Sequence, residues 1–188
     1  MIELPTDRRK RMATDVAWCL GFALWLLAMY LYCCDADAAD DPATAYTADF
    51  LQHYPERRAA ALALIPAVQS AAAEYNLDPL LMVMLIAMES SWKPGATGQA
   101  DERGLFQIMP GGPCARGQNL TTPEGQIAAG ARCLRMCADD CGGADDTARL
   151  RRMLTKYASG QCVHQSESVK RKIEYRVRKY DRLREQYR

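Results

Sequence analysis

Nine consecutive apolar residues near the middle of the chain constrain its fold more than any other segment. They run from Leu80 to Met88, follow the pair Asp78-Pro79 and end at the acidic residue Glu89. Asp78 is placed to cap a helix, and proline suits the first helical position. A helix that is apolar on nearly every side must be surrounded by protein. The pattern therefore predicts a buried helix at the centre of a helical domain.

Glycine and proline residues divide the neighbouring sequence into further amphipathic helices. The expected helices are Ala59–Ile65, Pro66–Tyr75, Thr122 to about Cys141, Asp146 to about Tyr157, and Ser168–Tyr187. Residues 95–104 are polar and irregular, with room for a short hairpin. The predicted fold class is therefore mainly α, with at most a small β-hairpin. The last helix is strongly basic, but its apolar stripe indicates packing on the domain, and no nucleic-acid motif accompanies it.

A second apolar segment lies near the N-terminus. The residues from Val16 to Cys34 carry no charge, and a run of that length can cross the hydrocarbon core of a membrane. Basic residues crowd positions 8–11, and none occurs from Asp35 to Glu56, which predicts a cytoplasmic N-terminus and an exported C-terminal part. A cleaved signal peptide is the alternative, because Ala36-Asp37-Ala38 has the small-x-small pattern of a cleavage site.

These features predict four parts of the chain. They are a cytoplasmic basic N-terminus (1–12), a transmembrane anchor or uncleaved signal (13–34), an acidic, alanine-rich linker (35–55) and the helical domain (56–188).

The chain has eight cysteines, which is many for a cytosolic protein of this length. Three belong to the N-terminal apolar segment, where they act as small apolar residues. The other five are Cys114, Cys133, Cys137, Cys141 and Cys162. In an exported domain they predict disulfides, with one cysteine left over and the pairing undetermined. A zinc site built on Cys133, Cys137 and Cys141 with Cys162 and His164 is the alternative, although the spacings match no specific zinc signature. We expect no metal and no cofactor.

Glu89 is the candidate catalytic residue. It follows the apolar helix directly, so burial should raise the pKa of its carboxyl toward neutrality. That property suits an acid that protonates a glycosidic oxygen. The alternative is a residue at the helix end that simply faces water.

Two short segments carry a specific family resemblance. Glu89-Ser90-Ser91-Trp92-Lys93-Pro94, followed by Gly104-Leu105-Phe106-Gln107-Ile108-Met109-Pro110, resembles the signature of the lytic transglycosylases with the goose-type lysozyme-like fold. Pro123–Leu134 and Tyr157-Ala158-Ser159-Gly160 resemble two later motifs of that family, with Gln126 and Ala158 where asparagine is usual. The resemblance covers about residues 65–180.

The resemblance implies a lysozyme-like domain that cleaves peptidoglycan glycan strands between N-acetylmuramic acid and N-acetylglucosamine, with 1,6-anhydro-muramic acid as product. Glu89 would act as general acid and then base. Phe106 would wall the substrate pocket, Gln107 would bind the sugar, and Tyr157 would hold Glu89. Ser90 would lie at the substrate site and orient the helix end. The domain would lie in the periplasm, anchored to the inner membrane or secreted after cleavage near Ala38, and could serve a secretion, conjugation or phage complex.

Two other functions stay open. Asp101 lies in the loop where hydrolytic relatives carry a second carboxylate, so Glu89 and Asp101 could form a muramidase if they faced each other across a cleft. The alternative for Asp101 is a solvated loop residue. An inactive wall-binding module is the other possibility, and Ala158 is the residue that favours it.

Overall fold

A computed structural model describes residues 41–187 of the chain. The expected anchor (13–34) and the basic segment before it lie outside the described residues. The chain divides into two units, 1–41 and 42–188, and residues 42–187 of the second form the helical domain. Within 41–187, no helix combines the length and the hydropathy that a membrane span requires.

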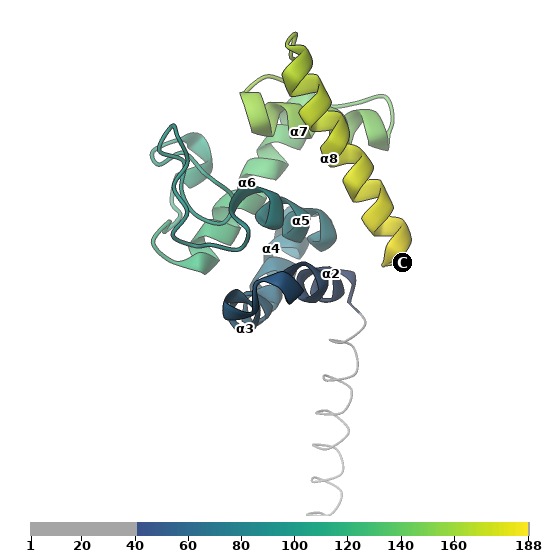
Figure 1. The fold of residues 1–188 in the computed structure, drawn as a ribbon. Coiled ribbons are helices and arrows are strands. Elements are labelled where there is room, and N and C mark those ends of the chain that lie inside the picture. Colours follow the sequence, from purple (N-terminus) through teal and green to yellow (C-terminus); the bar gives the residue numbers. More distant parts are fainter. Residues whose placement is uncertain (1–40, 188) are drawn as a thin grey trace, which may run out of the picture. The chain divides into compact units, whose positions relative to one another are not determined.

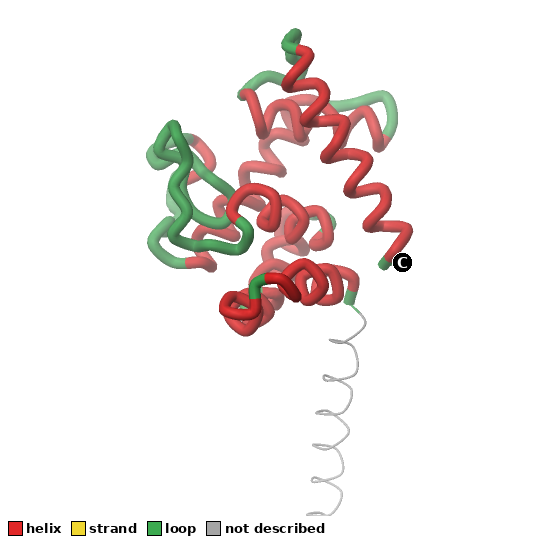
Figure 2. Tube along the Cα trace, in the orientation of Figure 1, coloured by secondary structure: helices red, strands yellow, loops and turns green. Residues whose placement is uncertain are grey.

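The second unit is built from helices (Figures 1 and 2). The α-helices are α2 (Pro42–Phe50), α3 (Pro55–Ala63), α4 (Ile65–Tyr75), α5 (Pro79–Ser90), α6 (Pro123–Cys141), α7 (Asp146–Ser159) and α8 (Glu167–Gln186), and the short 3₁₀ helices are η1 (Leu51–His53) and η2 (Pro113–Ala115). In place of a hairpin, two isolated antiparallel bridges join Thr97 to Arg103 and Arg103 to Ile108. The prediction of a mainly α fold is confirmed.

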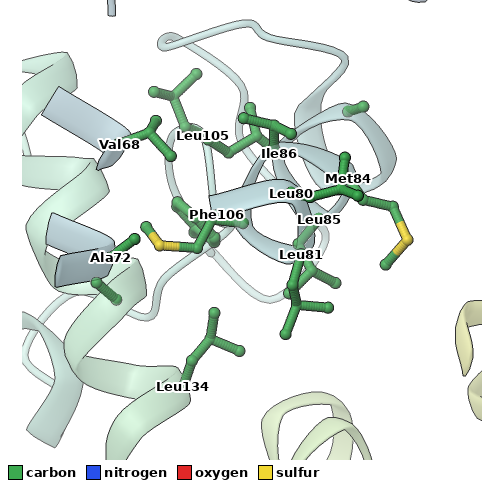
Figure 3. Packing of buried hydrophobic residues seen from close by; sticks show 14 of the residues in the cluster. Val68, Ala72, Leu80, Leu81, Met84, Leu85, Ile86, Leu105, Phe106 and Leu134 are labelled. Atoms are coloured by element: carbon green, nitrogen blue, oxygen red, sulfur yellow. The ribbon is translucent and has the colours of Figure 1, made fainter. Parts of the chain in front are cut away.

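Helix α5 lies at the centre of the domain, as predicted. Its residues 80–87 are all buried, and the Asp78 carboxylate accepts a hydrogen bond of 2.8 Å from the Leu80 N–H at its first turn. Each large apolar side chain buried in this way contributes about 1.5–3 kcal/mol. Figure 3 shows the core from close by, with Phe106 between side chains of α4 and α5.

The domain begins earlier than the sequence predicted. Residues 42–53, which were expected in the linker, form α2 and η1, and Ala43, Tyr46 and Leu51 are buried. The Tyr46 ring meets the Tyr187 ring edge to face, with centroids 6.2 Å apart. The linker prediction was wrong here because the segment has only a few contact residues, and these stand among small and polar residues that show no clear apolar stripe.

Helix α8 packs along α7 and reaches α5. Its buried residues include Ile173, Val177, Tyr180 and Leu183, which belong to the predicted apolar stripe, and also Arg176. In Figure 1 the loops between α5 and α6 lie on one side of α5, and α8 lies on the other. The C-terminal end of α5 therefore lies between two segments that are distant in the sequence.

Candidate active site

A cleft of about 660 Å³ opens beside the C-terminal end of α5. Its walls come from α5, the loop over residues 98–114, α6, α7 and α8. Four of the residues predicted from sequence line it, namely Glu89, Phe106, Gln107 and Tyr157.

The Glu89 side chain is largely buried and forms an ion pair. Its side chain is 17% exposed, and its Oε1 atom accepts a charge-assisted hydrogen bond of 2.5 Å from Nη2 of Arg176. The alternative hypothesis, that Glu89 simply faces water, is therefore wrong. The turn after it, at Ser91 and Trp92, has left-handed φ values of 50° and 60°. This turn ends α5 and leaves Glu89 at the edge of the cleft.

Arg176 is the principal residue that the sequence reasoning missed. It comes from α8, is 2% exposed, and two of its nitrogens, Nε and Nη1, are buried without a hydrogen-bond partner within residues 41–187. The signal was present in the sequence, because Arg176 follows Ile173 by three positions and precedes Tyr180 by four. Those spacings place it on the apolar, inward face of the helix.

Gln126 holds the loop that carries the cleft residues. Its Oε1 accepts from the Leu105 N–H at 2.9 Å, and its Nε2 donates to the carbonyls of Pro94 at 3.0 Å and Leu120 at 2.9 Å. Gly104 has a φ of +76° and lies so close to Gln126 that an added Cβ would come within 2.3 Å of the amide. This buried amide thus fixes both ends of the loop against α6.

Phe106 and Tyr157 form one wall of the cleft. The Tyr157 hydroxyl donates to the Phe106 carbonyl at 2.5 Å, and the Phe106 ring lies against Gly130 of α6. Burial, and next the negative charge of Glu89, hold the pKa of Tyr157 well above its ordinary value. Tyr157 was expected to hold Glu89, but its hydroxyl instead bonds the backbone that carries Phe106, and Arg176 holds Glu89.

The amide of Gln107 is fixed by the backbone. Its Nε2 donates to the carbonyls of Gly104 at 2.9 Å and Ala96 at 3.3 Å. Its Oε1 atom faces Gly98. Sugar binding by Gln107 stays a prediction. Because its Nε2 already donates to two carbonyls, Oε1 is the atom that could accept a hydrogen bond from the sugar.

Comparison with known proteins agrees with this geometry. Residues 66–177 match the family model described as the transglycosylase SLT domain. The chain belongs to this family. It is also similar to a protein named transglycosylase from Enterobacteria phage PRD1, with 37% identity over 76 residues, which are 40% of this chain and 29% of the phage protein. The match therefore spans less than a third of that relative.

Two predicted site residues of the SLT domain lie outside the cleft. Ser90 is 7% exposed and donates to the Ile86 carbonyl at 3.1 Å, so it belongs to the helix and not to the substrate site. The Asp101 carboxylate is 63% exposed and pairs with Arg103 at 3.1 Å. Of the two possibilities for Asp101, the structure agrees with the solvated loop residue, since Asp101 has a φ of +67° and a largely exposed side chain. Its neighbour Glu102 lines the cleft instead.

The cysteines of the SLT domain form two disulfides, as predicted. Cys114 pairs with Cys133 and Cys141 pairs with Cys162, while Cys137 is free, buried and part of the cleft lining. The zinc alternative fails, because three of its four cysteines, Cys133, Cys141 and Cys162, are held in the two bridges and only Cys137 is free. Residues 41–187 contain no group of His, Cys, Asp and Glu side chains that could hold a metal ion.

Charged side chains from three helices complete the cleft. Lys156 of α7 forms an ion pair with Asp140 of α6, and Lys172 of α8 is exposed. Ala158, which stands where the family usually has asparagine, also lines the cleft. The cleft therefore carries both signs of charge beside Glu89.

Proposed function

We propose that the protein is a peptidoglycan lytic transglycosylase that cleaves the β-1,4 bond between N-acetylmuramic acid and N-acetylglucosamine and forms 1,6-anhydro-N-acetylmuramic acid. The observation that carries the proposal is a carboxylate held by an arginine at the end of a buried helix, in the cleft of an SLT domain. The substrate class rests on family membership.

In the proposed reaction Glu89 acts twice. Glu89 enters the reaction protonated on Oε2 while Oε1 still accepts from Arg176, and it first gives this proton to the glycosidic oxygen as the bond from that oxygen to muramic C1 breaks. The muramic C6 hydroxyl then bonds to C1, and its proton returns to Glu89. The carboxyl group ends as it began and no water is consumed, so one carboxyl group suffices, unlike the paired carboxyls of hydrolytic glycosidases.

Arg176 acts in this proposal as a positioning residue. It occupies Oε1 of Glu89, so Oε2 is the oxygen available for proton transfer. A charge-assisted hydrogen bond from a buried guanidinium also fixes the direction of the carboxyl group. Phe106 and Tyr157 then shape the wall beside the sugar, and Gln107 offers its Oε1 to it.

Hydrolysis is the second candidate, and the presence of Glu102 in the cleft favours it. An inverting muramidase needs a second carboxylate that activates water across the cleft. Digestion of purified murein followed by mass spectrometry separates the two reactions. Transglycosylation predicts anhydro-muropeptides, each lighter by one water than the corresponding reducing-end product. Reducing-end products alone would exclude the proposed reaction and favour the muramidase.

The substitution Glu89→Gln tests the catalytic residue. Loss of a general acid lowers rates by about 10²–10⁴-fold, so we expect muropeptide release to fall to near background while thermal unfolding remains cooperative. Glu74→Gln is the matched control, because Glu74 is exposed on α4, away from the cleft, and we expect full activity. A wild-type protein that binds murein and releases nothing would indicate the wall-binding module.

We further propose that residues 13–34 anchor the protein in the inner membrane with the domain in the periplasm. The uncharged run and the basic cluster before it support this proposal, as do the two disulfides of the domain, since disulfides persist in oxidising compartments. A role in an envelope-spanning secretion, conjugation or phage complex is consistent with the similarity to the phage protein.

A further inference from the structure

Two acceptor oxygens converge over Gly98 in the cleft. A Cβ atom added to Gly98 would lie 2.3 Å from Oε2 of Glu102 and 2.8 Å from Oε1 of Gln107. Both oxygens therefore approach the same face of Gly98, which is possible only because residue 98 has no side chain. All three residues line the cleft that contains Glu89.

Backbone hydrogen bonds hold both acceptors in place. The Nε2 of Gln107 donates to the carbonyls of Gly104 and Ala96, which directs Oε1 the other way. The Ala100 N–H donates to Oε2 of Glu102 at 2.9 Å, and the Gly98 N–H donates to the Glu102 carbonyl at 2.8 Å. Acceptors ordered before binding lose little freedom when a ligand arrives.

Glu102 also lacks a cationic partner. Its neighbour Arg103 pairs with Asp101, and two of the cleft cations, Arg176 and Lys156, pair with Glu89 and Asp140. The third, Lys172, lines the cleft without an ion pair to Glu102. Within residues 41–187 no ion pair involves Glu102. A carboxylate in a cleft without such a partner is free to accept hydrogen bonds from a ligand.

We propose that Glu102 is a substrate-binding residue which, together with Gln107, accepts hydrogen bonds from the hydroxyl and acetamido N–H groups of an N-acetylglucosamine unit. The inference rests on the proposed function for its substrate class and adds a residue to the site. A pair of acceptors suits neutral O–H and N–H donors and repels carboxylates. N-acetylglucosamine carries a free 3-hydroxyl that can donate to this pair, whereas the same oxygen of N-acetylmuramic acid is an ether and cannot donate, so this part of the cleft favours N-acetylglucosamine.

The test is binding of a β-1,4-linked N-acetylglucosamine oligomer to the full chain by calorimetry, together with the KM and kcat of murein cleavage. Glu102→Ala should weaken oligomer binding about tenfold or more, the size of one charge-assisted hydrogen bond. It should raise KM more than it lowers kcat. Glu102→Gln keeps an acceptor oxygen without the charge and should fall between wild type and Glu102→Ala.

Two further variants separate binding from folding. Gly98→Ala should weaken oligomer binding as Glu102→Ala does, because the new Cβ displaces both oxygens, while the flexible Glu102 side chain can move and leave the fold intact. Asp101→Ala is the control, since this exposed neighbour lies outside the cleft lining, and it should bind as wild type does. Thermal unfolding of each variant checks the fold.

The inference would be overturned if Glu102→Ala bound the oligomer as tightly as the wild-type protein does, or if the wild-type protein did not bind the oligomer. Muropeptide release tests the proposed function separately. If the wild-type protein releases no muropeptides but Glu102→Ala and Gly98→Ala still weaken oligomer binding, the proposed glycan-binding site is supported and the proposed transglycosylase activity is wrong. If murein is cleaved and the Glu102 and Gly98 variants behave as wild type, the reverse holds.

Discussion

The ion pair between Glu89 and Arg176 joins two helices that are far apart in the sequence. Arg176 is almost completely buried and Glu89 is largely buried, and removal of water from two charges offsets much of their attraction. Removal of only one partner is costly, because it leaves the other charge uncompensated. The pair therefore couples the candidate catalytic residue to the packing of α8.

Arg176→Met should lower the free energy of unfolding by about 3 kcal/mol, because Glu89 then remains enclosed without its cation. In the background of Glu89→Gln the same substitution should cost clearly less, since an amide needs no counter-charge. Urea denaturation of the wild type, Arg176→Met, Glu89→Gln and the double variant gives the coupling free energy between the two side chains directly.

Arg178→Met is the control for α8, because Arg178 is two positions away and exposed, and it should change stability by no more than about 0.5 kcal/mol. Equal costs of Arg176→Met with Glu89 and with Gln at position 89 would show that the pair is not coupled.

Cys137 is expected to be an unreactive thiol despite its place in the cleft. Burial raises its pKa to about 11, with Lys156 opposing the shift and Asp140 adding to it. The thiolate is the reactive form, and it becomes abundant only as the pH rises through about 11. Compared with the same thiol in the unfolded chain, with a pKa of 9.0, Cys137 should react about 100-fold more slowly with iodoacetamide at neutral pH.

Mass spectrometry of the peptide that contains Cys137 measures this rate without interference from the cysteines near the N-terminus. The rate in native protein should increase steeply between pH 8 and pH 11, a range that follows from the raised pKa. Rapid labelling of native protein at neutral pH would contradict the buried, protonated thiol.

At the scale of the helices, prediction from sequence worked where pattern and capping agreed. The α5 helix combined an apolar run with Asp78 and Pro79 at its start, and α6 and α8 had clear stripes, so their bounds were nearly correct. The α2 helix was missed, because its few contact residues stand among alanines. Loop residues were harder, since a left-handed φ at Asp101 turns its side chain outward and leaves Glu102 facing the cleft. Periodicity gives no information on such turns.

Gly130 illustrates how α6 and the cleft wall depend on each other. An added Cβ would lie 2.2 Å from the ring of Phe106, which is 1% exposed and has no free space. Gly130→Ala should therefore cost about 1–3 kcal/mol of stability despite the better helix propensity of alanine. It should also lower murein cleavage, because Phe106 lines the cleft. Thermal unfolding and muropeptide release measure the two effects.

Gly95→Ala is the matched control, since no atom lies within 4 Å of a Cβ at that position. It should leave both stability and activity unchanged. A Gly130→Ala protein as stable as wild type would show that Phe106 can move away and that α6 does not fix the cleft wall.

At the scale of the whole molecule, the two disulfides tie α6 to both of its neighbouring segments. Cys114–Cys133 joins α6 to η2, and Cys141–Cys162 joins its end to the segment after α7. Each closes a loop of about twenty residues, for which the chain-entropy model gives about 3 kcal/mol. Sequence could predict the number of bridges but not the pairing, because the pairing depends on how α6, α7 and η2 pack.

The same bridges bear on where the protein resides. If residues 13–34 form an uncleaved anchor with the basic cluster in the cytoplasm, alkaline phosphatase fused after residue 41 should be active in a Gram-negative host, because that enzyme needs the oxidising periplasm. The full chain should then stay in membranes after carbonate extraction, with both disulfides of the domain oxidised. A soluble periplasmic product that begins near Ala38 would instead establish a cleaved signal peptide.

Replacing Arg8, Arg9, Lys10 and Arg11 by glutamine separates charge from hydropathy, since it removes the positive-inside signal and leaves the apolar run unchanged. Phosphatase activity should fall in this variant. If the fusion of the unaltered sequence is inactive and the domain cysteines of the full chain are reduced, the domain is not exported.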